Sequence, residues 1–537
     1  MGKKTIISGL NPIGHLILFF GIFCSFTVRA QLYFPNANYY HSEVERFNLK
    51  SENITHYQNH LASKPLLDTK TNSDSIYNSD GDYYYWITQK LFKENFIIFK
   101  GEDFWCSVDP IIDAELGTDV SMDSLSTMYW NTRGIRVQAK FYDKVAFTTS
   151  VYETQAIVPE YQAIFFNNHG EFRPTNQGYK QENGYIPMYG RTKPFKVNGY
   201  DFAFAEGNLS IVPAEWLNFQ LGNGNQFIGD GYRSFFLSDF SGNYPFIKTE
   251  VFTLKGKLQY NIIYASLTNP YRLRVFSTPE ATYERKIGVF HYLDYSVTKN
   301  FNLSFFEGSN WRSTDSTGTH NPDYLFTNPV IGVNSIIKGS QAENYNSILG
   351  VGASYTIQNS KFYTQVVIDN GEFGAFQVGL KSYDLFTNRL DLRVEFNHAV
   401  QNTYLSDNKR YNYSHNNLSL AHPYDNGFNE LIGEISYQNR RFFISNKIIL
   451  SARYVNDSIN IGNDILQPKS DINISEQSQP NVFYNQLEIG YRLNKNYNLQ
   501  VVGGYIFRQD NNKYNPTTTN YIYFGVRTRL RNKTLDW

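Results

Sequence analysis

The chain has 537 residues, and its 49 basic and 49 acidic residues cancel, so its charge gives no bias towards nucleic acid or an acidic surface. Charged residues make up 18% of the sequence, fewer than the usual quarter in a soluble domain, while aromatic residues reach 17%. A β-barrel in a membrane uses many amphipathic rings as girdles at both interfaces, so the composition favours such a barrel over a water-soluble protein.

Residues 1–30 have the pattern of an export signal. Two lysines precede an apolar stretch at residues 13–26, and Val28-Arg29-Ala30 then offers small residues at the cleavage positions. We therefore expect the mature chain to begin at Gln31. An uncleaved membrane anchor is the alternative, but the apolar stretch is shorter than the roughly 20 residues of a spanning helix.

The cysteines agree with an exported protein. Cys24 would identify a lipoprotein if it carried a lipid, but Phe23 before it is bulkier than such an attachment site accepts. After cleavage only Cys106 remains, which excludes an intramolecular disulfide and a zinc site built from cysteine.

Residues 31–100 are predicted to form a small, helical, periplasmic region. The spacing of apolar residues predicts one helix over His41–Leu61 and a second over Tyr83–Lys93, separated by a Ser/Asn/Asp-rich linker at residues 68–82. Because the chain starts in the periplasm, we expect this region to pack below the barrel or into it.

His56 and His60 lie four residues apart, so in a helix they would share a face, as in the HExxH zinc motif. Tyr57 stands where that motif needs its glutamate, and two histidines leave most of a metal's coordination shell empty. A solvated helix face is the better interpretation, and the sequence predicts no metal site and no other cofactor.

Residues 101–537 are predicted to be an all-β transmembrane barrel of antiparallel strands. Beyond the signal, no stretch approaches the roughly 18 uninterrupted apolar residues of a helical span. Strand-like alternation is frequent instead, because successive side chains of a strand point to opposite faces. In residues 390–397 the apolar face holds Leu390, Leu392, Val394 and Phe396, and the polar face holds Asp391, Arg393, Glu395 and Asn397. The last strand, expected at 520–531, places Ile522, Phe524, Val526 and Leu530 on one face and Arg527, Arg529 and Arg531 on the other.

The lengths of the connections separate a membrane barrel from a soluble sandwich. Short turns are predicted at Asp143-Lys144, 213–216, 255–257, 298–300, 358–360, 384–389, 438–440 and 494–496. Between them lie long polar connections at about 156–198, 223–244, 268–284, 307–346, 398–428 and 452–481. Alternating short and long connections are typical of short periplasmic turns and longer extracellular loops.

The hairpins, with a first strand around 110–118 and the last strand, give about 18 strands, an even number as bacterial barrels require. Both ends of the barrel then face the periplasm. The predicted location is the outer membrane of a Gram-negative bacterium, with outer-membrane lipid as a partner.

The stretch from Gly222 to Lys248 is rich in glycine, but it does not match a nucleotide-binding motif. A dinucleotide fingerprint that started at Gly222 would need a glycine where Phe227 stands, and a Walker loop would need Lys-Ser or Lys-Thr after its last glycine. The stretch falls between the fifth and sixth strands. We therefore expect its glycines to form tight turns of positive φ at the barrel rim, with Gly229 among them.

Charged and aromatic residues in two long loops are the predicted ligand-binding site at the rim. The residues are Asp230, Tyr232, Arg233 and Asp239, with Arg191, Lys193 and Lys196 from the preceding long loop. Aromatic faces stack on sugars, and arginine pairs with uronate or phosphate groups. A loop that is salt-bridged internally and only closes the barrel mouth is an equal alternative. In either case Arg233 needs a carboxylate partner, with Asp230 or Asp239 as the candidates.

Catalytic arrangements are weaker alternatives. Asp113 with Glu115, and Asp391 with Glu395, have the spacing of acids that line a lumen. A hydrolase would need a nucleophile beside a base such as His291 or His398, and no serine near either lies in a recognisable motif. The sequence therefore predicts no catalytic residues and no enzyme activity.

The plan of the chain resembles the Wzi-like capsule-assembly outer-membrane proteins. The phrases "FIGDGYRSFFLSDFSGNYPFIK" and "NTRGIRV" (131–137) are most similar to a branch associated with gliding motility, the RemB-like proteins. The resemblance implies a non-enzymatic barrel that binds or organises surface polysaccharide, or supports motility or secretion machinery, without nucleic acid. A porin-like transport channel is the alternative, although the resemblance and residues 31–100 suggest an occluded lumen.

Overall fold

The structure is a computed structural model. It describes residues 37–50, 60–66, 83–121, 127–142, 144–196, 198–273, 283–320, 324–339, 341–342, 345–454, 459–472, 481–512 and 516–537. The expected signal peptide, the linker at 68–82, His56 and Asp143 lie outside these residues.

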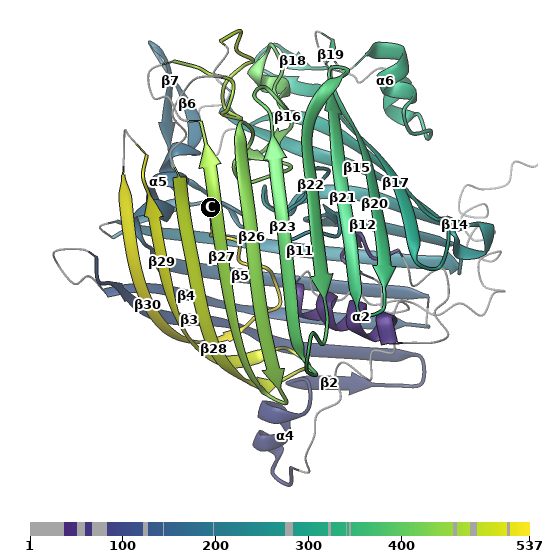
Figure 1. Ribbon diagram of the computed structural model, residues 1–537, viewed down its shortest axis with the longest axis vertical. Helices are drawn as coiled ribbons and strands as arrows, with labels where there is room; N and C mark the ends of the chain where they lie inside the picture. The colour runs from purple at the N-terminus through teal and green to yellow at the C-terminus, as the bar shows by residue number, and fades with distance from the viewer. Residues whose placement is uncertain are drawn as a thin grey trace, which may run out of the picture.

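Eighteen long antiparallel strands of the described chain form one closed barrel, as predicted (Figure 1). Each strand pairs with the next along the chain, and the first closes on the last, with Asp113 opposite Arg527 and Asp119 opposite Tyr521. The strands are β3 (Phe104–Asp119), β4 (Thr127–Phe141), β5 (Val145–Ile157), β11 (Gly199–Ala214), β12 (Leu217–Gly224), β14 (Tyr244–Thr253), β15 (Leu258–Arg272), β16 (Tyr283–Ser296), β17 (Phe301–Asp315), β20 (Tyr345–Ile357), β21 (Ser360–Asp369), β22 (Glu372–Ser382), β23 (Leu390–Ala399), β26 (Phe428–Asn439), β27 (Phe442–Arg453), β28 (Asn481–Asn494), β29 (Leu499–Asp510) and β30 (Thr517–Thr528).

The predicted short turns all join consecutive barrel strands at one end of the barrel. The predicted long connections lie at the other end, with one exception to the alternation. The exception lies at the long-loop end, where β21 and β22 are joined only by Asn370 and Gly371. Both residues have positive φ, a conformation that suits a two-residue hairpin. The short-turn end is therefore the periplasmic end, and the long-loop end is extracellular.

The faces of the strands follow the predicted alternation. On β23 Val394 is exposed on the outer wall, while Glu395 and Asn397 are fully buried in the lumen. The prediction for the last strand was wrong beyond Thr528, where β30 ends. Residues 529–537, here called the tail, turn into the lumen, so that Leu530 is buried inside instead of facing lipid. Among the described helices, none is long and apolar enough to cross a membrane.

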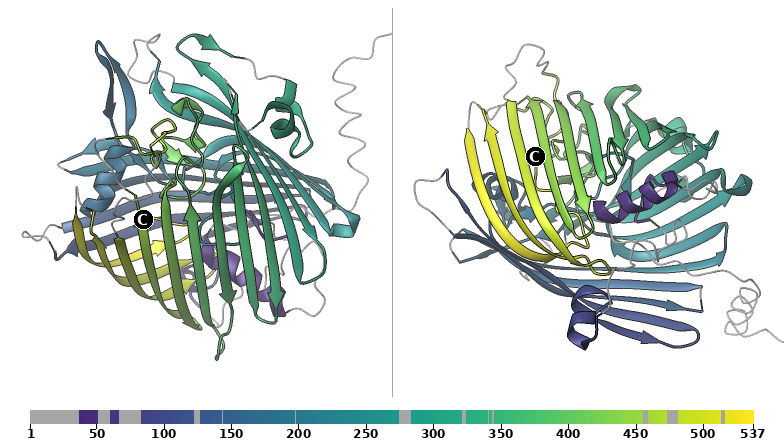
Figure 2. Two further views of the ribbon diagram at one scale, coloured as in Figure 1. Left: turned by 45° about the horizontal axis from the view of Figure 1, so that its top comes forward. Right: turned by 60° about the horizontal axis from the view of Figure 1, so that its bottom comes forward.

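The lumen is filled by four segments of the chain. They are the N-terminal segment with α2 (Asn38–Lys50), residues 225–243, here called the inner loop, residues 400–427, and the tail. Figure 2 (right) shows α2 lying within the opening at the periplasmic end. Apolar side chains of the inner loop, residues 400–427 and the tail form one core, which includes Phe235, Phe236, Leu237, Phe240, Tyr404, Leu405, Tyr413, Leu418, Leu535 and Trp537. The apolar side chains of α2, Tyr40 and Val44, belong to a second cluster with Leu530 of the tail. Each such side chain stabilises the packing by roughly 1.5–3 kcal/mol.

The N-terminal region is only partly helical where it is described. The first predicted helix covers Asn38–Lys50, but His60 and Leu61 lie in an extended segment, and Ser63–Lys64 (β1) pairs with Phe227–Ile228 (β13) of the inner loop. The second predicted helix is α4 (Trp86–Phe92). It is followed by β2 (Ile97–Lys100), a strand that the sequence did not indicate.

One extracellular connection folds over the outside of the barrel. On β17, Phe306 stacks on Phe236 of the inner loop, so even-numbered side chains face the lumen and Glu307 faces outward. The outward carboxylate accepts hydrogen bonds from the backbone of Gly332 and Ser335 at 2.7 and 2.9 Å. Residues 324–339, here called the outer flap, therefore cover Glu307, with α6 (Val333–Lys338) beside the wall (Figure 1).

The remaining described elements are short and lie in the connections. They are α5 (Glu160–Asn168), β6 (Glu171–Thr175), β7 (Gly178–Glu182), β8 (Tyr185–Ile186), β9 (Gly190–Arg191), β10 (Lys193–Phe195), η4 (Leu254–Gly256), β18 (Gly318–Thr319), η5 (Tyr324–Thr327), β19 (Gln341–Ala342), η6 (Lys409–Tyr411), β24 (Ser414–His415) and β25 (Leu418–Ser419).

Candidate functional site

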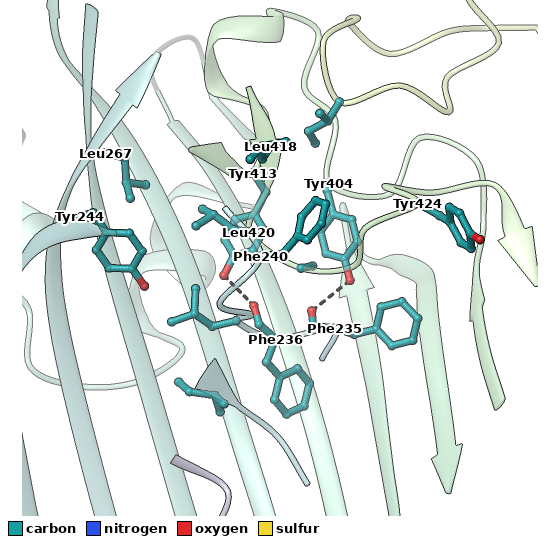
Figure 3. Close-up of a cluster of buried hydrophobic side chains, with 14 of the residues drawn as sticks. Phe235, Phe236, Phe240, Tyr244, Leu267, Tyr404, Tyr413, Leu418, Leu420 and Tyr424 are labelled. Carbon is teal, nitrogen blue, oxygen red and sulfur yellow. Dashed lines mark hydrogen bonds between the residues drawn. The ribbon is translucent and has the colours of Figure 1, made fainter. Parts of the chain in front are cut away.

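The inner loop lies inside the lumen and not at the rim. Figure 3 shows Phe235 and Phe236 side by side, with their carbonyl oxygens accepting hydrogen bonds from the hydroxyls of Tyr404 and Tyr413 at 3.0 and 2.7 Å. Both tyrosines belong to residues 400–427. The two loops from opposite sides of the barrel therefore hold each other across the lumen.

Polar side chains of the wall pair with the backbone of the inner loop. Glu395 of β23 accepts hydrogen bonds from the amides of Tyr232 and Arg233 at 2.6 and 3.1 Å. Gln377 of β22 donates to the carbonyl of Arg233, and Gln365 of β21 accepts from the amide of Phe235. Glu395 thus lines the lumen, as predicted, and supplies the hydrogen-bond acceptors that these buried backbone amides need.

Arg233 has carboxylate partners, but they are not the predicted ones. Its guanidinium lies 3.2 Å from Glu430 of β26 and 3.0 Å from Asp536 of the tail, and all three side chains are at most 2% exposed. Asp230 instead pairs with Lys361, and Asp239 accepts a hydrogen bond from Asn532 of the tail. Of the two acids nearest in sequence, Asp230 thus contacts the wall at β21 and Asp239 contacts the tail.

Asp536 joins the tail to the inner loop and the wall. It accepts a hydrogen bond from the hydroxyl of Tyr232 and forms an ion pair with Lys447 of β27, besides the pair with Arg233. Burial alone would raise the pKa of Asp536, but Arg233 and Lys447 hold it well below its usual value. The charged form is therefore the one that the folded lumen stabilises.

Asp230 belongs to a second cluster, which holds α2. Lys361 lies 2.5 Å from Asp230 and 3.7 Å from Glu45 of α2, and Lys381 lies 2.7 Å from Glu45. Tyr383 donates a further hydrogen bond to Glu45 at 2.7 Å. Lys361 thus ties both the inner loop and α2 to the wall, and Lys381 adds a second contact to α2.

Close packing requires Gly229 and Gly231 of the inner loop, whereas Gly242 lies at a turn. Gly222 and Gly224 lie in β12, outside any turn. A Cβ on Gly231 would lie 2.6 Å from the Arg233 carbonyl and from side-chain oxygens of Gln377 and Glu395. Gly229 has a φ of +159°, next to the extended region, and its added Cβ would lie 2.8 Å from Gln365. Of the predicted positive-φ turns, one is present at Gly242, with a φ of +91° and an amide that donates to the Asp239 carbonyl at 3.3 Å, whereas Gly222, Gly224 and Gly231 have no positive φ.

Arg191 and Lys193 lie apart from the inner-loop residues. Arg191 and Arg272 both pair with Glu171, at 3.0 and 2.7 Å. Burial alone would raise the pKa of Glu171, but Arg272, Tyr283, Asn183 and Arg191 together lower it to about 2. Lys193 is exposed on β10. Lys196 is also exposed, with its ammonium 5.1 Å from the ring centroid of Phe195. The structure therefore does not bring the seven predicted site residues into one site.

A different site opens at the extracellular end, here called the outer cavity. It has a volume of about 430 Å³ and is lined by α5, the ends of β27 and β29, and residues from three long loops. Its aromatic lining consists of Tyr161, Phe165, Tyr424, Tyr454 and Trp537. The ring of Trp537 packs 4.3 Å from Phe165, measured between ring centroids, so the tail supplies part of the floor.

Charged side chains surround these rings. Asp510 pairs with both Arg453 and Arg508 at 3.0 Å, and Arg508 also donates to the main-chain oxygen of Trp537 at 3.0 Å. Arg508 lies over Tyr161 at 4.7 Å from the ring centroid. Burial, and then the neighbouring Asp464, raise the pKa of Asp425 well above its usual value. The cavity thus presents rings, guanidinium groups and carboxyl groups together.

The lumen below the outer cavity holds two further, smaller spaces, of about 100 and 190 Å³. Both are lined by Lys447, Gln486, Glu488 and Arg529, so they follow the same part of the wall. Leu535 and Asp536 line the space of about 100 Å³, and Trp537 lines the outer cavity. The tail therefore forms part of the partition between the lumen and the outside.

The other predicted candidates have structural partners. His60 is fully buried, with ring nitrogens 2.7 Å from Asp294 and 2.8 Å from the Gly256 carbonyl. Asp113 and Glu115 both lie 3.6 Å from Lys533 of the tail. No group of three or more His, Cys, Asp or Glu side chains in the described chain is placed to hold a metal ion.

Comparisons with known proteins identify the fold. No family model and no curated protein matches the sequence. The structure is similar to Wzi of Escherichia coli, described as an outer membrane protein involved in group 1 capsule assembly and a carbohydrate-binding β-barrel. The match has a TM-score of 0.53 at 10% identity and covers 93% of this chain and 98% of Wzi. Two weaker matches are proteins of Pseudomonas aeruginosa. OpdQ has a TM-score of 0.41 at 9% identity, and the match covers 79% of this chain and 96% of OpdQ. The outer membrane protein opdK has a TM-score of 0.40 at 9% identity, and the match covers 79% of this chain and 98% of opdK.

The protein is an outer-membrane β-barrel of a Gram-negative bacterium. Its closed barrel, apolar outer wall and charged lumen are what that membrane requires, and the similar fold of Wzi agrees.

Sequence reasoning missed the outer cavity for a physical reason. Its residues come from α5, three loops, two strand ends and the tail, so no local motif contains them. The tail gave no clear signal, because "LDW" at 535–537 alternates apolar and acidic residues, as a strand with one face in lipid also does.

Proposed function

We propose that the protein binds a surface polysaccharide in the outer cavity and holds it at the cell surface without catalysis. The observation that carries this proposal is the aromatic and charged lining of a cavity of about 430 Å³ above a filled lumen. Aromatic faces stack on sugar rings, and arginine and carboxyl groups bind hydroxyl, uronate or amino substituents. A carbohydrate-binding function has been described for Wzi, whose fold is similar, and this supports the proposal.

Direct binding tests the proposal. Purified barrel is titrated with polysaccharide released from the cells that make it, and compared with Phe165→Ala and Arg453→Ala variants, whose side chains line the outer cavity. Loss of one stacking or charged contact should weaken binding by roughly 1–3 kcal/mol, or about 5-fold to 150-fold. Lys193→Ala is the matched control, because Lys193 is an exposed loop cation that does not line the cavity. Equal binding by all four proteins would contradict the site.

The two candidate roles in the cell differ in what the attached polymer does, so they predict different defects in a deletion strain. A Wzi-like function predicts that a deletion strain releases its capsule, whereas a RemB-like function predicts that it no longer spreads over surfaces. Complementation with Phe165→Ala should fail in whichever assay the deletion affects. A deletion strain that is normal in both assays would remove the cellular basis of the proposal.

A transport channel is the second candidate function. It is favoured by the two spaces that follow the wall along β27–β30, because they already occupy part of a path through the lumen. The tail, the inner loop and α2 would have to move before that path was continuous.

A further inference from the structure

An aromatic surface projects from the periplasmic end of the barrel. Four consecutive residues at the start of α4 are exposed: Tyr84 by 91%, Tyr85 by 75%, Trp86 by 62% and Ile87 by 49%. Surfaces that face water rarely hold so many neighbouring aromatic and apolar residues, so we expect this surface to contact a partner. Figure 1 shows α4 at the lowest part of the molecule, next to β2.

The opposite side of α4 is fixed to the periplasmic turns of the barrel. Asn494 donates hydrogen bonds to the carbonyls of Lys90 and Glu94, both at 2.9 Å. Arg441 donates to the hydroxyl of Tyr83 and the carbonyl of Phe92 at 3.0 and 3.1 Å. Because both anchors lie in short turns, α4 is held at the level where the barrel leaves the membrane.

β2 continues the lipid-facing wall below the last strand. On β3 the even-numbered side chains face outward, as the 37% and 63% exposure of Ile112 and Leu116 shows. β30 pairs with β3 only from Asp113 to Asp119, because the tail then turns inward. Below that point β2 pairs with the same edge of β3 from Trp105 to Val108.

The register places the apolar side chains of β2 on the lipid side. Ile97 pairs with Val108 and Phe99 with Cys106, both on the outward face of β3. Ile97 and Phe99 are 41% and 55% exposed. The outer wall and the aromatic start of α4 are thus joined through β2 into one apolar surface.

We propose that residues 83–100 form a lipid-binding hook, with Ile97 and Phe99 against acyl chains and Tyr84, Tyr85 and Trp86 in the headgroup layer of the periplasmic leaflet. The partner is phospholipid. Tyrosine and tryptophan favour that layer because each has an apolar ring and a polar group. The hook fixes the N-terminal region to the membrane surface, so that this region does not hang freely in the periplasm.

Site-specific fluorescence tests the hook in liposomes of phosphatidylethanolamine and phosphatidylglycerol. A polarity-sensitive dye is attached to Tyr85→Cys in a Cys106→Ser background, and spin-labelled lipid or aqueous iodide is added. We expect quenching by lipid labelled near the headgroup and protection from iodide. Glu102→Cys is the matched control, because Glu102 is exposed and polar in the turn between β2 and β3. Its dye should show the opposite pattern.

Intrinsic fluorescence gives a second measurement that needs no cysteine. Brominated lipid should quench a component of the wild-type emission that is lost in Trp86→Phe, a variant that keeps an apolar ring. Iodide quenching at position 85 equal to that at 102, or no difference between wild type and Trp86→Phe, would overturn the proposal. Either result would leave the surface facing water and open to a periplasmic protein.

Discussion

At Arg233 the inner loop, the barrel wall and the tail meet in one buried cluster. Replacing Arg233 with Ala leaves Glu430 and Asp536 buried beside each other without their shared cation. Removing one partner of a buried ion pair typically costs about 3–5 kcal/mol. We expect the barrel to insert normally, since its lipid-facing band is unchanged, but the inner loop should become sensitive to protease.

The matched control is Arg173→Ala, which removes an arginine that is 59% exposed and pairs with Glu182 at 3.6 Å. An exposed pair contributes only about 0–1 kcal/mol. Both proteins are compared by the temperature at which the folded form loses its fast electrophoretic migration. Equal temperatures for the two variants would show that the Arg233 cluster does not hold the lumen closed.

The carboxyl groups of Asp536 and Glu45 make this packing dependent on pH. Burial alone would raise the pKa of each, but Arg233 and Lys447 hold the pKa of Asp536, and Lys381 and Lys361 that of Glu45, well below the usual range. A depressed pKa in the folded state stabilises above the unfolded value of about 4, and this stability is lost as pH falls below it.

Pepsin cleavage of the inner loop and tail should therefore accelerate from pH 5 to pH 3. Asp536→Asn should be cleaved faster already at pH 5, and its rate should change less with pH, because one titrating group is gone. A wild-type cleavage rate that is flat across this range, after correction for pepsin activity on an unfolded control, would contradict the assignment.

At the scale of elements, Glu307 holds the outer flap against the outside of the barrel wall. The carboxylate accepts three hydrogen bonds from the flap, from the amides of Gly332 and Ser335 and from the Ser335 hydroxyl. Hydrogen bonds to a charged group contribute about 1.5–3 kcal/mol each, so Glu307→Ala should raise flap opening by at least about tenfold. Alanine suits a lipid-facing wall, so the barrel itself should not suffer. The rate of thermolysin cleavage between residues 324 and 339 in intact cells measures the opening.

Ser347→Ala is the control for the flap, because it removes the hydroxyl contacts of Ser347 with Ser335 and with Ser309, both at 2.9 Å, and leaves the hydrogen bonds to Glu307 in place. Its cleavage rate should stay near that of wild type. Rapid cleavage of the wild-type flap would show that Glu307 does not hold it against the barrel.

The strands could be predicted from sequence, whereas the segments inside them could not. Alternation such as that of Val394 and Glu395 is local, and lipid outside with polar groups inside enforces it along each strand. The partners of Arg233 are 197 and 303 residues away in the chain, so nearby Asp230 and Asp239 were the only visible candidates. The prediction for the tail was wrong for a related reason. Arg529 and Arg531 continue the alternating pattern of β30, although the backbone leaves the sheet after Thr528.

At the scale of the whole molecule, the segments that fill the lumen distinguish the attachment function from the transport function. The outer half is closed by the inner loop, residues 400–427 and the tail, whereas α2 lies at the periplasmic end. Deleting residues 31–100 removes α2 and β1 but leaves the cluster of Arg233, Glu430 and Asp536 in place. We therefore expect neither the full-length protein nor this deletion to show steady, large currents in planar bilayers.

A second change is needed to open the lumen. Replacing residues 229–241 with a short Gly/Ser linker, in the protein that also lacks 31–100, removes Arg233, Phe235 and Phe236 from the core. Ion flow should then begin along the wall that Lys447, Gln486 and Glu488 line, and Glu488→Gln should change its cation selectivity, because charged lumen residues set selectivity. Large, steady currents from the full-length protein would instead favour the transport function, since they would mean that the inner loop and tail leave the lumen without any deletion.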